Sequence, residues 1–144
     1  MNREEAALKQ AVKFTRKDAR EFLMQTVFQM DAQKELDPAH LDRYFEGKKF
    51  GSQTRYVNAV MRNMLENIEE LDTLINSVSD GWSTSRMAKP DLAIIRVAVA
   101  EIKYAEDVPQ AVAINEAVNL SKLYGTEQSP KFINAVLGKI SKAI

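Results

Sequence analysis

Residues 92–102 read LAIIRVAVAEI, and this run decides the fold. Nine of its eleven residues are apolar, the exceptions being Arg96 and Glu101. A helix that is apolar nearly all round belongs at the centre of a bundle, although the β-branched residues leave a buried strand as a lesser alternative. Strand-like alternation is not sustained elsewhere in the sequence, so a strand here would have no partner. The run therefore predicts a central helix in an all-α domain.

Helical spacing of apolar residues precedes this run. Thr15 followed by Asp18 is typical of a capping box that opens a helix. Asp37-Pro38 ends that helix, because proline cannot continue it. From 54 to 78 the apolar residues alternate steps of four and three, which predicts one long helix with a single buried stripe.

Similar spacing follows the central run. Pro90 suits the first turn of the central helix, and the chain turns again at Val108-Pro109. The next apolar stripe ends at Gly125, which is expected to be the C-cap. Ser129 is then expected to cap the last helix, with Pro130 at its first position. In all, about seven helices are predicted, with no repeats and no flexible linker.

Composition limits the protein's environment. The chain has 144 residues, the size of one domain, with 45% hydrophobic and 28% charged residues, as in a soluble globular protein. It has no cysteine, which excludes disulfides and thiolate sites, and no apolar run approaches the roughly 20 residues that span a bilayer. The charged N-terminus lacks a secretory stretch, so a cytoplasmic protein is expected.

Catalytic and metal-binding patterns find little support. His40 is the one histidine and is interpreted as a surface residue. Neither the spacing of zinc ligands nor a glycine-rich phosphate loop occurs, so no enzyme, cofactor or metal is predicted. Arg96, within its apolar run, is expected to form an ion pair that joins helices, because an unpaired buried guanidinium is costly.

A basic cluster near the N-terminus is more informative, because Lys+Arg and Asp+Glu each total 20 over the chain. Helical spacing places most of the cluster on one flank, where it would suit phosphates, although a solvated face explains it equally well. Residues 9–20 contain only one acid, Asp18, and five cations: Lys9, Lys13, Arg16, Lys17 and Arg20.

The run DVPQAVAINEAVNLSKLYGTEQSPKFINAVLGKI, residues 107–140, resembles the NusB family of transcription antitermination factors. The family pattern has V-P, A-I-N-E-A-V, F/Y-G and S-x-K-F-x-N-x-V-L in this order. Arg16-x-x-Ala19-Arg20-Glu21 and Trp82-x-x-x-Arg86, which leads into Ala93-Ile94-Ile95-Arg96, agree as well. The resemblance covers roughly residues 15–143.

The resemblance implies an all-α fold of two three-helix bundles set across each other. It divides the chain into an N-terminal extension, 1–14, expected to be helical, and a NusB-like RNA-binding domain, 15–144. The implied role is non-enzymatic: binding the boxA element of nascent ribosomal RNA, as a single strand, together with the ribosomal protein NusE. The complex helps RNA polymerase to resist termination. Some members self-associate, so a homodimer is compatible with the family.

Family positions also imply site residues. Those expected to contact RNA are Arg16, Lys17, Arg20, Tyr124, Gln128, Lys131 and Phe132, with Tyr124 stacking on a base. Phe28 and Asp91 match positions that face NusE. Gln128 stands where the family commonly has an acidic residue. Leu92 stands where the family often has a basic residue. The polar residues Asn115, Glu116 and Asn134 are expected to form hydrogen bonds between helices.

Two alternatives stay open at this stage. One is the NusB-like accessory domain of ribosomal RNA methyltransferases, for which this chain would have to be a fragment, since it ends at Ile144 without a nucleotide-binding segment. The other is a protein-interaction module that needs NusE and has little RNA affinity of its own, which the net charge of zero favours.

Overall fold

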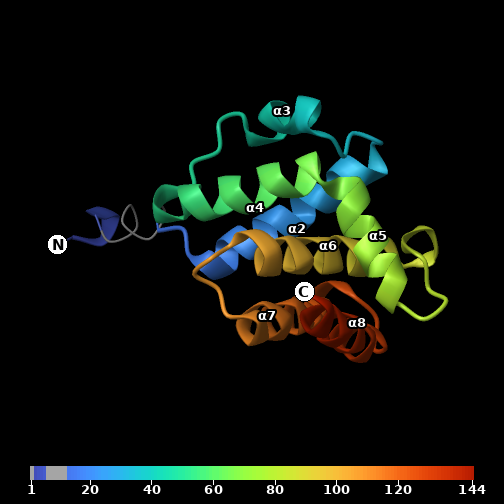
Figure 1. The fold of residues 1–144 in the computed structure, drawn as a ribbon. Coiled ribbons are helices and arrows are strands. Elements are labelled where there is room, and N and C mark those ends of the chain that lie inside the picture. Colours follow the sequence, from blue (N-terminus) through green and yellow to red (C-terminus); the bar gives the residue numbers. More distant parts are fainter. Residues whose placement is uncertain (1, 6–12) are drawn as a thin grey trace.

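The structure, a computed structural model, describes residues 2–5 and 13–144, and its regular elements are helices (Figure 1). No strand occurs in these ranges, which confirms the predicted all-α class. The expected helix over 1–14 lies largely outside the described residues, as does Lys9. The α-helices are α2 (Arg16–Ala32), α3 (Leu41–Phe45), α4 (Thr54–Glu66), α5 (Ile68–Val78), α6 (Lys89–Tyr104), α7 (Gln110–Tyr124) and α8 (Ser129–Ala143). Short 3-10 helices are η1 (Pro38–His40), η2 (Gly51–Gln53) and η3 (Thr84–Arg86).

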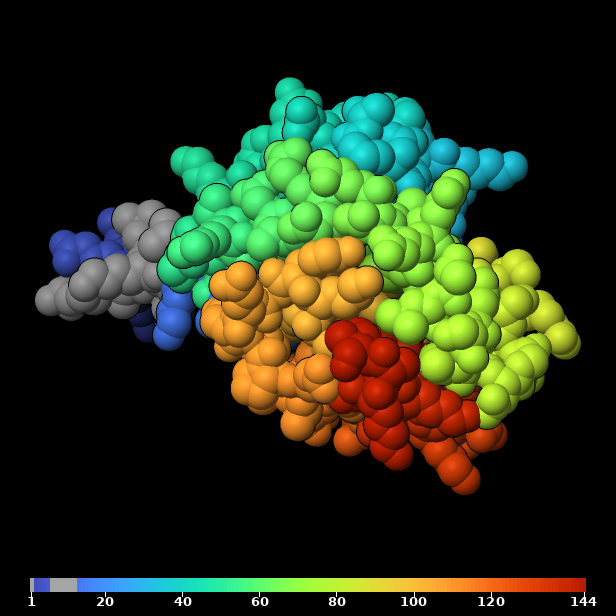
Figure 2. All heavy atoms as spheres, viewed as in Figure 1, coloured from blue at the N-terminus to red at the C-terminus, as the bar shows by residue number. Residues whose placement is uncertain are grey.

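Helix α6 forms the centre of the molecule, as its apolar sequence predicts. Every residue from 91 to 101 is buried. In Figure 1, α2 and α4 lie on one side of α6 and α7 and α8 on the other, and α6 packs against all four. Figure 2 shows α8 (red) lying against α5 (yellow-green), with the segments around α3 and α4 forming the opposite side. Because α6 serves both groups of helices, the grouping into two three-helix bundles stays a prediction.

The single long helix predicted over 54–78 is wrong, because the chain bends at Asn67. This residue has φ −122° and ψ 26°, outside the helical region, and α5 diverges from α4 after it (Figure 1). Its side-chain amide donates to the Asn63 carbonyl at 2.8 Å, which is the local competition that asparagine offers to a helix. The apolar spacing continues across the bend, so Leu71 and Ile75 remain fully buried.

The start of α2 follows the predicted capping box. The Thr15 hydroxyl accepts the Asp18 N–H at 3.1 Å, and the Asp18 carboxylate accepts the Thr15 N–H at 3.0 Å. The hydrogen bond from the Thr15 backbone N–H is the largest cause of a lowered pKa of the Asp18 carboxyl. The cap fixes the first turn of α2, where the predicted phosphate-binding cations begin.

The junction of α7 and α8 differs from its prediction in detail. Gly125 is the C-cap but is extended, with φ −100° and ψ −168°, so its glycine is not explained by a left-handed turn. A methyl group there would lie 2.5 Å from Ser129 Cβ and 2.9 Å from the Ser121 carbonyl oxygen, so close packing requires glycine. Ser129 is the first residue of α8 instead of its cap, and its hydroxyl accepts the Thr126 N–H at 2.9 Å.

Arg96 is paired, as expected. Its guanidinium donates to both carboxylate oxygens of Asp72 at 3.0 and 2.8 Å and lies 3.3 Å from Asp31. These contacts join α6 to α5 and α2. His40 is half-buried at the surface, where its ring lies 2.8 Å from the Asp37 carboxylate.

Candidate nucleic-acid and partner interface

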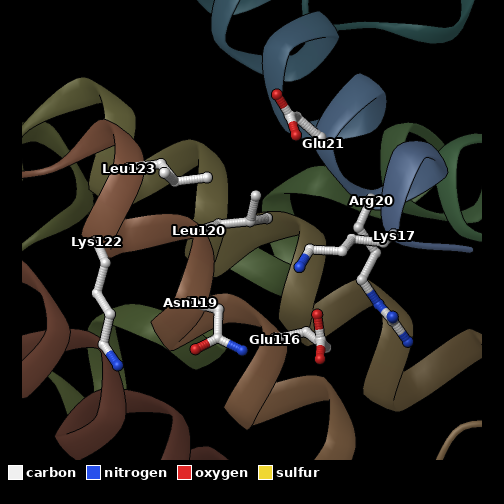
Figure 3. A pocket seen from close by; sticks show the side chains of 8 residues that line it. All are labelled: Lys17, Arg20, Glu21, Glu116, Asn119, Leu120, Lys122 and Leu123. Carbon is white, nitrogen blue, oxygen red and sulfur yellow. The ribbon is translucent and has the colours of Figure 1, made fainter.

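A hollow of about 270 Å³ separates α2 from α7 (Figure 3). Residues spaced three and four apart lie on the same face of a helix, so each helix contributes one face to it. Its lining from α2 is Lys17, Arg20 and Glu21, and its lining from α7 is Glu116, Asn119, Leu120, Lys122 and Leu123. Two cations of the predicted cluster therefore meet residues about 100 positions away in the sequence.

Arg20 lies at the inner side of this hollow, in an ion pair with Glu101 of α6. Its Nε and Nη2 donate to Glu101 Oε1 at 2.8 and 2.7 Å, and the two side chains are only 9% and 2% exposed. Burial alone would lower the pKa of Arg20, but Glu101 outweighs it and raises the pKa. The Arg20 charge is therefore already balanced by Glu101 inside the protein, and its predicted contact with RNA phosphates stays a prediction.

Arg16 faces a different hollow, of about 470 Å³, at the start of α4. Its guanidinium lies 4.0 Å above the Tyr56 ring, donates to Gln53 Oε1 at 2.6 Å and pairs with Asp107 at 3.1 Å. The hydrogen bond from Arg16 lowers the pKa of Asp107. The predicted single flank of cations is therefore divided, with Arg16 on one side of α2 and the exposed Lys17 on the other.

Tyr124 fastens the end of α7 to α2. Its hydroxyl donates to Glu21 and accepts the side-chain amide of Gln25 at 2.9 Å. The hydrogen bond to Glu21 raises the pKa of Tyr124. Tyr124 also lines a hollow of about 190 Å³ with Phe28 and Pro90. The residue predicted to stack on RNA thus lies beside one predicted to face a partner.

A fourth hollow, of about 310 Å³, brings together Asp91, Gln128 and Phe132, which the sequence assigned to two functions. Trp82, 51% exposed, meets Phe132 edge-on with ring centres 6.4 Å apart. Asp91 is only 8% exposed, and its Oδ1 has no hydrogen-bond partner among the described residues. Lys131, which directly precedes Phe132 in the sequence, is exposed. In each of these two hollows, a residue predicted to contact RNA thus lies beside one predicted to face the partner.

The asparagines of the family motif do not join helices. Asn115 and Asn134 are exposed, so their side chains face solvent, and the prediction of hydrogen bonds between helices is wrong for them. Glu116 points into the first hollow (Figure 3). Asn119 and Leu123 were missed as site residues, although they follow Glu116 at helical spacing and so share its face.

Neither a metal-binding cluster nor a membrane-spanning helix is found in the part of the chain that the structure describes. Among the described residues, no three His, Asp or Glu side chains are grouped as they would be around a metal ion. The described helices also include none with the length and apolar character that a membrane span requires.

Comparison with known proteins identifies relatives along nearly the whole chain. The sequence model of the NusB family matches residues 17–142. The transcription antitermination protein NusB of Alkaliphilus oremlandii is 38% identical over 126 residues, which are 87% of this chain and 91% of that protein. NusB of Acetivibrio thermocellus is 39% identical over 128 residues, 88% of each chain.

Solved structures agree with this result. A structure of T. maritima NusB superposes with a TM-score of 0.80 at 29% identity, covering 90% of this chain and 92% of that one. A NusB in complex with NusE and double-stranded RNA gives a TM-score of 0.76 at 27% identity, covering 90% and 97%. From the family match over residues 17–142 and the identity to these relatives, the chain belongs to the NusB family.

Proposed function

We propose that this protein is a transcription antitermination factor that binds the boxA element of nascent ribosomal RNA together with NusE. The observation that carries the proposal is the family match over residues 17–142, with relatives named as antitermination proteins. A related NusB has been crystallised with NusE and RNA, which supports both kinds of partner. The proposed role is to help RNA polymerase resist termination in the cytoplasm, without catalysis.

The proposed binding surface comprises the hollow between α2 and α7, the hollow beside Phe28 and Tyr124, and the hollow at the start of α8. Lys17 would contact phosphates, because it is exposed and forms no ion pair with a described residue. Tyr124, Gln128, Lys131 and Phe132 would continue the RNA path over the junction of α7 and α8. Residues 15–144 would form the RNA-binding domain.

Phe28 and Asp91 are proposed to contact NusE. Phe28 is a large apolar side chain that is 40% exposed, and such side chains serve as anchors at protein interfaces. Asp91 lines the hollow beside Trp82 and Phe132, where its carboxylate would attract a basic side chain of another chain. Because Tyr124 lies beside Phe28, NusE and RNA would bind next to each other.

The test is binding of a labelled single-stranded boxA RNA, with and without NusE, at several salt concentrations. The boxA RNA should bind more tightly than a scrambled RNA. Lys17→Ala should reduce the slope of log affinity against log salt concentration by about 0.7. Lys48→Ala, which removes another exposed charge, from the segment between α3 and α4, is the matched control. Equal binding of boxA and scrambled RNA under all conditions would refute the proposal.

The interaction-module alternative makes a different prediction for the same experiment. The net charge of zero favours it, because general attraction to a polyanion is then weak. In that case NusE would bind this chain without RNA, and RNA affinity would not change with Lys17→Ala.

A further inference from the structure

We propose that the hollow between α2 and α7 is a subsite for one unpaired nucleobase that carries an exocyclic amino group, cytosine above all. Glu116 would accept the amino N–H, Asn119 would donate to the neighbouring ring acceptor, and Lys17 would hold the adjoining phosphate. The inference rests on the proposed RNA-binding function and names the chemistry that this part of the surface selects.

The polar groups of the hollow divide into engaged and unengaged ones. Arg20 is held by Glu101, and Glu21 accepts the Tyr124 hydroxyl. By contrast, within the described part of the chain neither Glu116 nor Asn119 has a side-chain hydrogen-bond partner. They lie three residues apart on α7 and face the hollow together (Figure 3). An acceptor and an amide are thus available side by side, as base-edge recognition requires.

Charge decides which part of a nucleotide enters. The carboxylates of Glu21 and Glu116 both line the hollow, and they would repel a phosphate placed between them. The Lys17 ammonium reaches from α2 across the hollow toward α7 (Figure 3) and can hold a phosphate at the rim. Lys122 adds a second cation at the other end. The base therefore lies inside and the backbone outside.

The apolar part of the hollow suits a flat ring. Leu120 and Leu123 form it, and Leu123 is 69% exposed, more than any other large hydrophobic side chain of the described chain. A base packed on these leucines would remove that apolar surface from water. The volume of about 270 Å³ is just below the usual range for drug-sized ligands, which fits a single base.

The carboxylate gives the selectivity. Cytosine presents its N4 amino group as a donor, which a glutamate accepts. Uracil has a carbonyl oxygen at the same place, and two acceptors facing each other repel. The expected discrimination between cytosine and uracil is about tenfold, within the range of a good base-edge pair. Comparison of two pyrimidines keeps ring size constant.

The experiment measures fluorescence anisotropy of labelled C12 and U12 RNA on the full chain, alone and with NusE, at one salt concentration. C12 should bind about tenfold more tightly than U12. Glu116→Gln should bring this ratio close to one, because the glutamine amide can also donate to the uracil carbonyl. Glu69→Gln, an exposed change of the same charge on α5, should leave the ratio unchanged.

Each outcome has one meaning. A cytosine preference that Glu116→Gln abolishes and Glu69→Gln retains supports the subsite. Binding that depends on Lys17 but shows no preference, or a preference that Glu116→Gln leaves intact, overturns the subsite and not the proposed function. Absence of C12 and U12 binding while boxA RNA still binds overturns the subsite alone, and absence of boxA binding as well, with and without NusE, overturns both. A second copy of the chain as the occupant would appear as a dimer that Leu123→Ser dissociates, and it too would overturn the subsite.

Discussion

Replacing Arg20 by methionine tests whether this residue serves the fold or the RNA. The substitution keeps most of the side-chain volume but removes the partner of Glu101, whose side chain is 2% exposed. A buried carboxylate left without its cation costs about 3–5 kcal/mol of the free energy of unfolding. Domains of this kind have only about 5–15 kcal/mol in total, so the variant should be close to its stability limit.

The double variant Arg20→Met with Glu101→Leu removes both charges of the pair and keeps two buried side chains of similar volume. An apolar pair of similar volume is often as stable as the buried ion pair or more so, so the double variant should regain most of the loss. Lys17→Met is the matched control on the same helix, where an exposed change should stay within about 0.5 kcal/mol. Urea unfolding followed by circular dichroism gives all four free energies.

Two results would refute this reasoning about Arg20. One is a loss below about 1 kcal/mol in Arg20→Met, far under the cost of a broken buried pair. The other concerns RNA: the double variant should keep the wild-type salt slope, because the Arg20 charge is neutralised by Glu101. A decrease of about 0.7 in that slope would show that Arg20 contacts a phosphate.

Other substitutions test further features. Gly125→Ala should cost about 1–3 kcal/mol in thermal unfolding, because its methyl would overlap the first side chain of α8. Gly138→Ala, with no atom within 4 Å, should be neutral or stabilise by about 0.5–1 kcal/mol. Asp107→Asn should raise RNA affinity severalfold at low salt by freeing Arg16; unchanged affinity would place Arg16 off the RNA path. Tyr124→Phe should cost about 1 kcal/mol of stability and leave RNA affinity unchanged, whereas loss of affinity would show that the hydroxyl itself contacts RNA.

The sequence predicts the helices well where local chemistry decides. The apolar run of α6 has one stable position, at the centre, and the capping box of Thr15 and Asp18 involves residues three apart. The bend at Asn67 was missed because the apolar spacing remains in phase across it, so periodicity alone cannot detect it. Gly125 was correctly predicted at the end of α7, but the reason was wrong. Glycine is required there because α8 approaches closely, and not because of a left-handed turn.

The candidate site was harder to predict, because its geometry depends on residues far apart in the chain. The spacing of Arg16, Lys17 and Arg20 places them near each other on α2 but does not reveal their partners. Glu101 is 81 residues from Arg20, and Asp107 is 91 residues from Arg16. Only the folded arrangement, which brings α6 and the segment after it against α2, shows which cation remains available for a ligand.

The central position of α6 also bears on how the protein is made. Helices α2 and α4, which precede α6 in the sequence, pack against it, and so do α7 and α8, which follow it. As the ribosome extends the chain, the first helices therefore have their apolar faces uncovered until about residue 104 has left the exit tunnel. A fragment that stops before α6 would lack the surface that buries them, so native structure should form late and in one cooperative step.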